Sequence, residues 1–190
     1  MAEPALIDIT LRVTPKHEYD TERYNFLQSG HLGTHFDVMN KEFPLAFVKR
    51  QAVVFDVTGI RNRDIAAEDI KLADIKPGMF VAFRTGYGEE HTYGTRAYFD
   101  GHPQLSDALI DALLQKDVSI IGVDCAGIRR GKEHTPRDQY CADHGVFVVE
   151  NLCGLQRVLA GEKTTQCLIY TFPVNFEGMT GLPCRVVAEK

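Results

Sequence analysis

Short runs of apolar and β-branched residues recur along this chain, and they constrain its fold more than any other feature. Runs of about four to eight such residues between turn signals are typical of strands buried in a sheet. They cover residues 6–11, 51–57, 79–86, 118–124, 146–150, 166–172 and 185–188. Helical spacing of apolar residues interrupts the series at 65–72, 105–114 and 152–159. Strands that alternate with a few helices predict an α/β fold with a mixed sheet.

The intervening segments are assigned from their caps and breakers. Asp64 and Ser106 are the expected N-caps of the first two helices. The polar residues 16–24 are expected to form a loop, as are residues 127–140, which contain a proline. Residues 87–101 are rich in Gly, Tyr and charge, and we expect a long irregular stretch at the rim of a functional site.

Length and composition place the chain among globular proteins. Its 190 residues fit a single domain spanning residues 1–190, and its net charge of −5 argues against binding nucleic acid, which needs a basic face. No apolar run approaches the roughly 20 residues that span a bilayer, and residues 1–4 do not resemble a secretory signal. Five widely spaced cysteines without a C-x-x-C pair indicate reduced thiols. We therefore expect a cytoplasmic protein that binds neither nucleic acid nor membrane and acts on a small molecule.

One short segment concentrates groups that bind metals. His31, His35 and Asp37 lie within seven residues around Gly33. On a helical turn the two histidines would share a face, whereas on a strand His35 and Asp37 would do so. Imidazole and carboxylate together suit borderline divalent cations such as Zn, Mn, Fe or Co. The alternative is three unrelated polar side chains in a loop.

Two predicted strands end in acids, and ligand sites of α/β folds tend to lie at the carboxyl ends of strands. Glu150 follows a fully apolar run, so burying its carboxylate requires a partner. That partner is either a metal ion or an arginine such as Arg129, Arg130 or Arg157. For Asp124 we favour a structural role as a cap of the next turn.

The segment H-x-G-T-H-x-D at residues 31–37 resembles the signature of the cyclase family of metal-dependent hydrolases, which includes bacterial kynurenine formamidases and isatin hydrolase. Further similar segments follow in order along nearly the whole chain. They are residues 79–86 (MFVAFRTG), 98–106 (YFDGHPQLS), 121–124 (IGVD), 145–152 (GVFVVENL) and 183–187 (PCRVV).

This resemblance implies a swivelling β/β/α-type domain that forms a homodimer or homotetramer. It also implies one or two divalent cations, Zn or Mn, that activate water for attack on an amide, formamide or lactam carbonyl. By the same resemblance, His31, His35 and Asp37 match the ligands of the first metal, and Asp37 is able to bridge two metals. Glu150 matches a glutamate ligand that comes late in the family's sequences.

The chain departs from the family pattern at three positions. Met39 stands where the family has a proline, and Lys41 stands where it has a histidine that acts as acid and base. Asp138 stands at the position of a histidine ligand, twelve residues before Glu150. Asp138 remains a competent ligand and shifts the preference toward Mn or Mg. His134 or His144 would supply the imidazole if the loop is rearranged.

Lys41 decides between two functional hypotheses. A lysine has a pKa of about 10.4 in water, but a nearby cation or desolvation lowers it enough for proton transfer, which would make Lys41 the catalytic acid and base. Alternatively, Lys41 replaces a metal as a fixed cation paired to Asp37, Asp138 or Glu150. The chain would then bind a small anion without a metal and without hydrolysing it.

Aromatic residues near the predicted rim are candidates for substrate binding. His102, Tyr98 and Phe99 are expected to line the mouth of the site together with Tyr87 and Tyr93. The alternative is that these rings pack a subunit interface.

The function predicted from sequence is therefore metal-dependent hydrolysis of a small amide, formamide, lactam or lactone, in the manner of an arylformamidase. The absence of Trp removes one aromatic suited to stacking an aryl substrate, which weakens the kynurenine-related alternative. Cys125 next to His134 would be a candidate nucleophile, but most cysteines at strand ends are inert.

Overall fold

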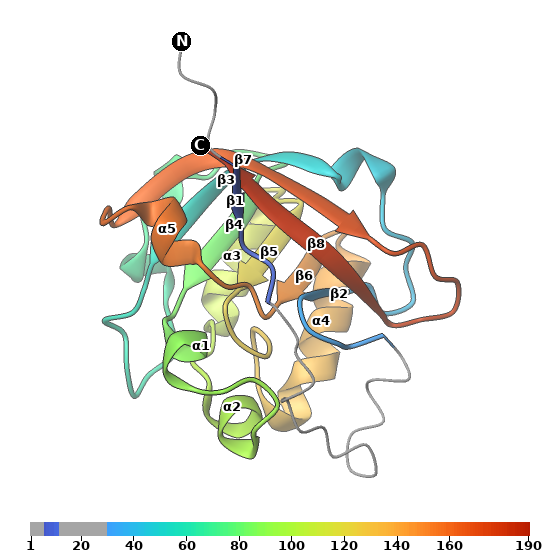
Figure 1. Ribbon diagram of the computed structural model, residues 1–190, viewed down its shortest axis with the longest axis horizontal. Coiled ribbons are helices and arrows are strands. Elements are labelled where there is room, and N and C mark those ends of the chain that lie inside the picture. Colours follow the sequence, from blue (N-terminus) through green and yellow to red (C-terminus); the bar gives the residue numbers. More distant parts are fainter. Residues whose placement is uncertain (1–5, 12–29) are drawn as a thin grey trace.

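The computed structural model describes residues 6–11 and 30–190, and most of its strands join into one closed sheet (Figure 1). The strands are β1 (Leu6–Asp8), β2 (His35–Asp37), β3 (Lys49–Asp56), β4 (Phe80–Arg84), β5 (Ile120–Val123), β6 (Phe147–Glu150), β7 (Thr164–Pro173) and β8 (Gly181–Glu189). Their order is β1-β8-β2-β6-β5-β4-β3-β7, and β7 also pairs with β8, which closes the sheet into a barrel. β1 is an extra strand on β8.

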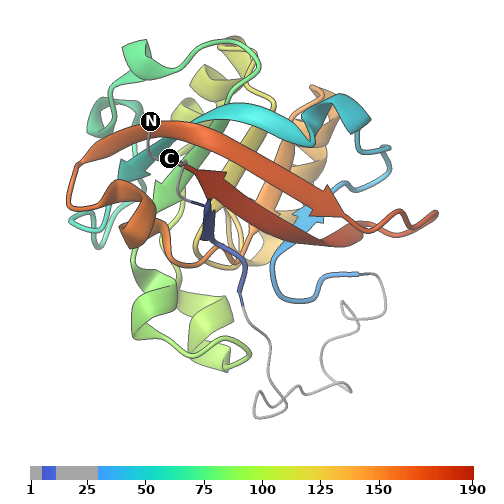
Figure 2. The ribbon, with the colours of Figure 1, turned by 45° about the horizontal axis from the view of Figure 1, so that its top comes forward.

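The sheet is mixed, as predicted. β3, β4, β5 and β6 run parallel to one another, and β2 lies antiparallel between β6 and β8. The long antiparallel pair β7–β8 crosses the front of the molecule in Figure 2 and completes the closure against β3. The predicted α/β fold with a mixed sheet is therefore confirmed.

Five α-helices occur in the described ranges. They are α1 (Tyr87–Glu90), α2 (Arg96–Gly101), α3 (Asp107–Gln115), α4 (His134–Asp143) and α5 (Leu155–Leu159). The hydroxyl of Ser106 accepts a hydrogen bond from the Leu109 amide, which confirms Ser106 as the N-cap of α3. None of these helices has the length and apolar character needed to cross a bilayer.

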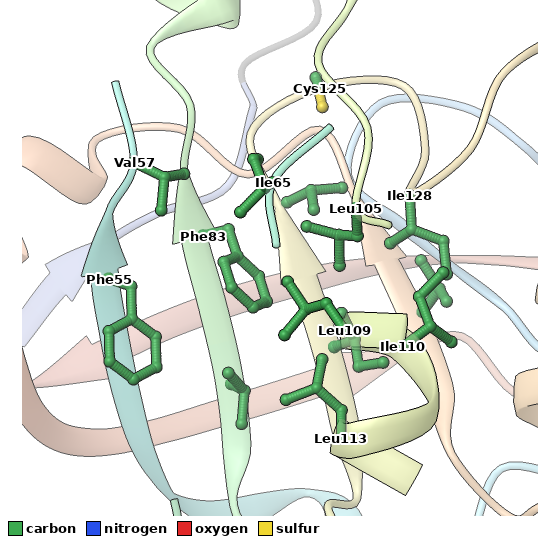
Figure 3. Close-up of a cluster of buried hydrophobic side chains, with 14 of the residues drawn as sticks. Phe55, Val57, Ile65, Phe83, Leu105, Leu109, Ile110, Leu113, Cys125 and Ile128 are labelled. Carbon is green, nitrogen blue, oxygen red and sulfur yellow. The ribbon is translucent and has the colours of Figure 1, made fainter. Parts of the chain in front are cut away.

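Alternation along the strands builds two hydrophobic cores. In β3, Val53 and Phe55 face the helical side, whereas Ala52 and Val54 face the inside of the barrel. Figure 3 shows the helical side, where Leu109, Ile110 and Leu113 of α3 pack over the parallel strands. Because both faces of these strands are covered, their sequences are almost continuously apolar.

One helix and one loop assigned from sequence are wrong. Residues 65–72 form no α-helix, and two 3-10 turns, Ala67–Asp69 and Leu72–Asp74, occupy this region. The Asp64 carboxylate lies 2.6 Å from Nη1 of Arg129 instead of capping a helix. Conversely, the second half of the loop expected at residues 127–140 belongs to α4. Pro136 lies in the first turn of that helix, where a missing N–H breaks no helical hydrogen bond.

Two further expectations have other outcomes. The stretch 87–101 contains the short helices α1 and α2, so it is more regular than expected. The predicted loop at residues 16–24 and the first residue of the segment Ser29–Asp37 lie outside the described residues.

Candidate metal centre

The centre lies where β2 meets β6, on the outer face of the barrel beside α4 (Figure 1). His35–Asp37 is extended, so the open question of helix or strand is resolved in favour of a strand. Phe36 points into the barrel core, and His35 and Asp37 consequently point to the opposite face. The antiparallel register places His35 directly opposite Glu150 at the end of β6.

The first half of the centre contains two imidazoles and one carboxylate. Nδ1 of His31 lies 3.1 Å from Nε2 of His35 and 2.8 Å from Oδ1 of Asp37. Nε2 of His35 is 3.5 Å from the same Asp37 oxygen. These three side chains form a cluster whose ligand atoms could hold one metal ion.

The second half shares Asp37 and adds residues from α4 and β6. His134 and Asp138 are four apart on α4, so both side chains lie on one face of the helix. Nε2 of His134 is 3.2 Å from Oδ2 of Asp138 and 3.4 Å from Oε1 of Glu150. The ligand atoms of Asp37, His134, Asp138 and Glu150 all lie within 4.8 Å of one another.

Hydrogen bonds on the far sides of the rings orient the two histidines of the first half. Nδ1 of His35 donates to the Gly33 carbonyl at 2.9 Å, so Nε2 faces the centre. Nε2 of His31 lies 2.9 Å from the hydroxyl of Thr180. Such outer contacts fix the tautomer and the orientation of metal-binding imidazoles.

Asn151, which directly follows β6, holds the segment that precedes β2. Its amide nitrogen donates to the Gly33 carbonyl at 2.9 Å, and its amide oxygen accepts from the Tyr98 hydroxyl at 2.7 Å. Its backbone carbonyl accepts from the Thr34 hydroxyl at 2.7 Å. Asn151 adopts a positive φ of 58°, an uncommon conformation that lets one residue reach all three partners.

Burial shapes the electrostatics of the three carboxyl groups, which are only 1–3% exposed. Burial and the charge of Asp37 raise the pKa of Asp138 well above its usual value, and burial with the charges of Asp37 and Asp138 does the same to the pKa of Glu150. Burial also opposes ionisation of Asp37, but the imidazoles of His31 and His35 outweigh it and lower its pKa. Burial lowers the pKa of His134.

These residues fit a divalent cation. Within the described ranges, both oxygens of Asp37, Oδ1 of Asp138 and Oε1 of Glu150 are buried without a well-aligned hydrogen bond, although Nδ1 of His31 lies 2.8 Å from Oδ1 of Asp37. Buried carboxylate oxygens without partners are costly, and a cation would satisfy them. Donors bound tetrahedrally at about 2.0–2.1 Å lie about 3.3–3.4 Å apart. This is close to the 2.8–3.5 Å separations of the first half and to the 3.2 and 3.4 Å distances from His134 to Asp138 and Glu150 in the second.

The centre opens into a cavity of about 550 Å³. Apolar parts of Met39, Tyr93, Phe99 and Ala126 form one part of its wall. Thr135, Asn151 and Thr180 add polar groups.

The structure brings together most of the residues singled out from sequence. His31, His35, Asp37, Asp138 and Glu150 line one cavity, and Phe99 lies on its wall. Among the described residues, Glu150 does not pair with an arginine, which was the alternative considered from sequence; it faces His35 and His134. Arg129 pairs with Asp64 and Glu133. The metal-binding and substrate-binding roles of these residues remain predictions.

Three other candidates lie elsewhere. Lys41 is exposed and its ammonium is 2.7 Å from Asp143, so it pairs with neither Asp37, Asp138 nor Glu150, and the lysine-for-metal hypothesis is wrong in its geometry. His102 and Tyr98 are buried and do not line the cavity. Nδ1 of His102 lies 2.9 Å from the Pro103 carbonyl.

Of the two histidines considered as replacements, the structure selects His134. The His144 ring is turned to the Tyr140 carbonyl, 2.8 Å away. Asn151 and Thr180 are further site residues that sequence reasoning missed. The signal for Asn151 was its place directly after Glu150 at a strand end, whereas nothing in the sequence indicates Thr180, which the β2–β8 pairing brings in.

The two remaining candidates have structural roles. The Cys125 thiol is fully buried, burial raises its pKa well above the ordinary value, and its sulfur lies 3.6 Å from the Gly127 carbonyl and 4.0 Å from the Pro103 carbonyl. Asp124 accepts hydrogen bonds from the amides of Thr85 and Gly86, each at 2.8 Å, so it has a structural role, but it caps the turn that follows β4 rather than the turn after its own strand.

Comparison with solved structures shows that this fold recurs. Isatin hydrolase A from Ralstonia solanacearum superposes with a TM-score of 0.77 at 17% identity over 98% of this chain and 92% of that one. Isatin hydrolase A from Labrenzia aggregata, bound to benzyl benzoate, gives 0.76 at 17% identity over 98% and 93%. A structure described as a "predicted metal-dependent hydrolase" from Bacillus stearothermophilus gives 0.72 at 20% identity over 99% of both chains.

A search of curated proteins found no match. The profile of the Cyclase family, described as "Putative cyclase", matches residues 7–129. This range includes His31, His35 and Asp37, and it covers more than half of the chain. The chain therefore belongs to the Cyclase family.

Proposed function

We propose that this protein is a metal-dependent hydrolase that acts on a small amide, formamide, lactam or lactone. The observation that carries the proposal is the meeting of three buried carboxyl groups and three imidazoles, with four carboxylate oxygens lacking well-aligned hydrogen bonds, at the base of a cavity. Membership of the Cyclase family and the structural likeness to proteins named isatin hydrolase support the reaction class.

His31, His35 and Asp37 would hold one cation, and Asp37, His134, Asp138 and Glu150 would hold a second. A divalent cation in such a site polarises a carbonyl group and lowers the pKa of water to near neutrality. The second-half ligands come from β2, α4 and β6, which the fold holds next to one another, so little ordering is needed when a ligand binds.

The chain's own residues orient the ligands and the substrate. Gly33 and Thr180 hold the His35 and His31 rings so that one nitrogen of each faces the centre. Phe99 and Tyr93 offer apolar ring surface on the cavity wall, which suits a small aromatic or cyclic substrate. The Tyr93 hydroxyl also accepts a hydrogen bond from the Gly33 amide at 2.8 Å, so Tyr93 contacts the segment between His31 and His35.

The test is a screen of formyl-anilides, lactams and lactones with metal-loaded protein, with and without chelator. Turnover that a chelator abolishes and added metal restores supports the proposal. Glu150→Gln should lose this turnover, whereas Glu162→Gln, an exposed position away from the cavity, should retain it. Turnover by the chelated protein, or a loaded protein that converts none of the three classes, would contradict it. A preference for formyl-anilides would support the finer arylformamidase-like assignment.

We also propose, from the sequence alone, that the protein is cytoplasmic and assembles as a homodimer or homotetramer. Size-exclusion chromatography with light scattering tests the second point directly.

A further inference from the structure

We propose that the two halves of the centre prefer different cations, so that the protein assembles a mixed-metal pair. The nitrogen-rich half consists of His31, His35 and Asp37, and it prefers a borderline ion such as Zn²⁺. The oxygen-rich half consists of Asp37, His134, Asp138 and Glu150, and it has a relative preference for a harder ion such as Mn²⁺. This inference rests on the proposed function only in requiring that the centre binds cations.

The donor atoms differ between the halves. The nitrogen-rich half offers two imidazole nitrogens and one carboxylate, a set typical of zinc. The oxygen-rich half offers one imidazole nitrogen and three carboxylates. Carboxylate oxygens suit Mn²⁺ and Mg²⁺ better than nitrogen donors do, and more oxygens also allow more than four ligands.

Asp138 is the residue that makes the second half oxygen-rich. Its carboxyl is 2% exposed, one oxygen lies 3.2 Å from Nε2 of His134, and the other has no hydrogen bond within the described ranges. Because His134 arrives from one helical turn earlier, Asp138 adds a fourth donor rather than replacing the imidazole. Both side chains therefore contribute to the same half.

Charge supports the same assignment. With Asp37 shared, the oxygen-rich half places three carboxyl groups around one point, and each is only 1–3% exposed. The described residues of the cavity wall include no lysine or arginine that could balance their negative charge. A second cation next to the first provides the positive charge that these groups lack. Asp37 belongs to both halves and would supply a carboxylate to both ions.

Zn²⁺ binds most sites of this kind more tightly than Mn²⁺ in absolute terms, so the experiment must compare the halves rather than the ions. The full-length chain is stripped with chelator and given one equivalent of Zn²⁺ with excess Mn²⁺. Free metal is then removed and the metal content is measured by mass spectrometry. Electron paramagnetic resonance distinguishes a Mn²⁺ next to diamagnetic Zn²⁺ from a spin-coupled Mn²⁺ pair.

The expected result is about one Zn and one Mn per chain, with the spectrum of uncoupled Mn²⁺. Asp138→Asn should weaken Mn²⁺ binding at least tenfold and change Zn²⁺ binding less than threefold. Asp138→His should take up two Zn when two equivalents are offered in the same excess of Mn²⁺. Asp143→Asn, on the same helix but paired with Lys41 outside the cavity, is the matched control and should behave as wild type.

Other outcomes overturn the inference. A spin-coupled Mn²⁺ pair in a mixture with two-zinc molecules would show that the halves do not discriminate, as would an equal loss of both ions in Asp138→Asn. If one cation binds and the oxygen-rich half stays empty, this inference fails while the proposed function survives. If no cation binds, both fail. Circular dichroism of each variant confirms that a loss of metal is not a loss of fold.

Discussion

His35 and Glu150 lie opposite one another in the register of β2 and β6, with Nε2 and Oε2 3.7 Å apart. This pairing brings an early histidine segment and a late glutamate to one point. Because the sheet hydrogen bonds fix the register, the two side chains meet whether or not a ligand is present. The protein thereby holds a carboxyl group beside the imidazoles at a buried position that disfavours its ionisation.

Glu150→Gln should distinguish the effect of the buried carboxyl group on stability from its effect on cation binding. The amide resembles the protonated carboxyl that burial favours, so the free energy of unfolding of the metal-free variant should lie within about 1 kcal/mol of the wild-type value. Its cation affinity should fall at least about tenfold, since an amide is a weaker ligand than a carboxylate. Urea unfolding and isothermal titration with Zn²⁺ measure the two effects. Unchanged affinity would remove Glu150 from the centre.

Lys41→Met should leave the protein nearly unchanged. The Lys41 ammonium pairs with Asp143 at a half-exposed position, and such ion pairs contribute about 0–1 kcal/mol. Metal content and turnover should stay within about twofold of wild type. If turnover falls more than tenfold at full metal content, Lys41 acts in catalysis despite its position, and the sequence-based prediction would be restored.

Gly127→Ala should damage the centre without replacing any of its proposed ligands. Gly127 has φ +115°, and an added Cβ would lie 2.7 Å from Nδ1 of His134 and 2.9 Å from Oε1 of Glu150. We expect the free energy of unfolding to fall by about 1–3 kcal/mol. We also expect the variant to lose most of the stabilisation that metal gives the wild type.

Gly145→Ala is the matched control for this change. Its φ is +73° and open space surrounds the added atom, so it carries backbone strain without a clash. It should lose about 1 kcal/mol and keep its response to metal. Thermal melts with and without Zn²⁺ compare the two variants, and equal responses to metal would contradict the steric account.

His102 should make stability fall in mild acid. Burial lowers its pKa from 6.5 to about 4. Between these values the unfolded chain binds a proton that the folded chain excludes, so stability is complete above pH 6.5 and falls as the pH decreases toward 4. The loss attributable to His102 should be about 2 kcal/mol at pH 5. Urea unfolding of wild type and His102→Gln at pH 7 and pH 5 measures it. An equal fall in both proteins would assign the pH dependence to other groups.

The sequence predicts the sheet well because its strands are buried on both faces. A continuous apolar run such as 118–124 needs no knowledge of its neighbours to be identified as a strand. Helix α4 could not be predicted in this way, because only Asp138, Cys141 and Ala142 are buried in it. Without an apolar stripe, a helix that carries two site residues has the composition of a loop.

The site was predictable where its residues are local or end a strand. His31, His35 and Asp37 are close in sequence, and Glu150 ends an apolar run. Lys41 illustrates what spacing cannot show. The chain turns directly after β2, where Met39 has a positive φ of 56° and the Lys41 amide donates to the Val38 carbonyl at 3.0 Å. This turn directs Lys41 away from the centre to the end of α4.

The central claim is that the imidazoles and carboxylates of this cavity bind divalent cations, and metal titration of the chelator-stripped wild-type chain tests it most directly. The account predicts one to two tightly bound ions per chain. It also predicts a rise in melting temperature of about 5–10 °C at a free metal concentration of about 100 times Kd. A stripped chain that binds no Zn²⁺ or Mn²⁺, and whose melting temperature neither ion changes, would contradict it.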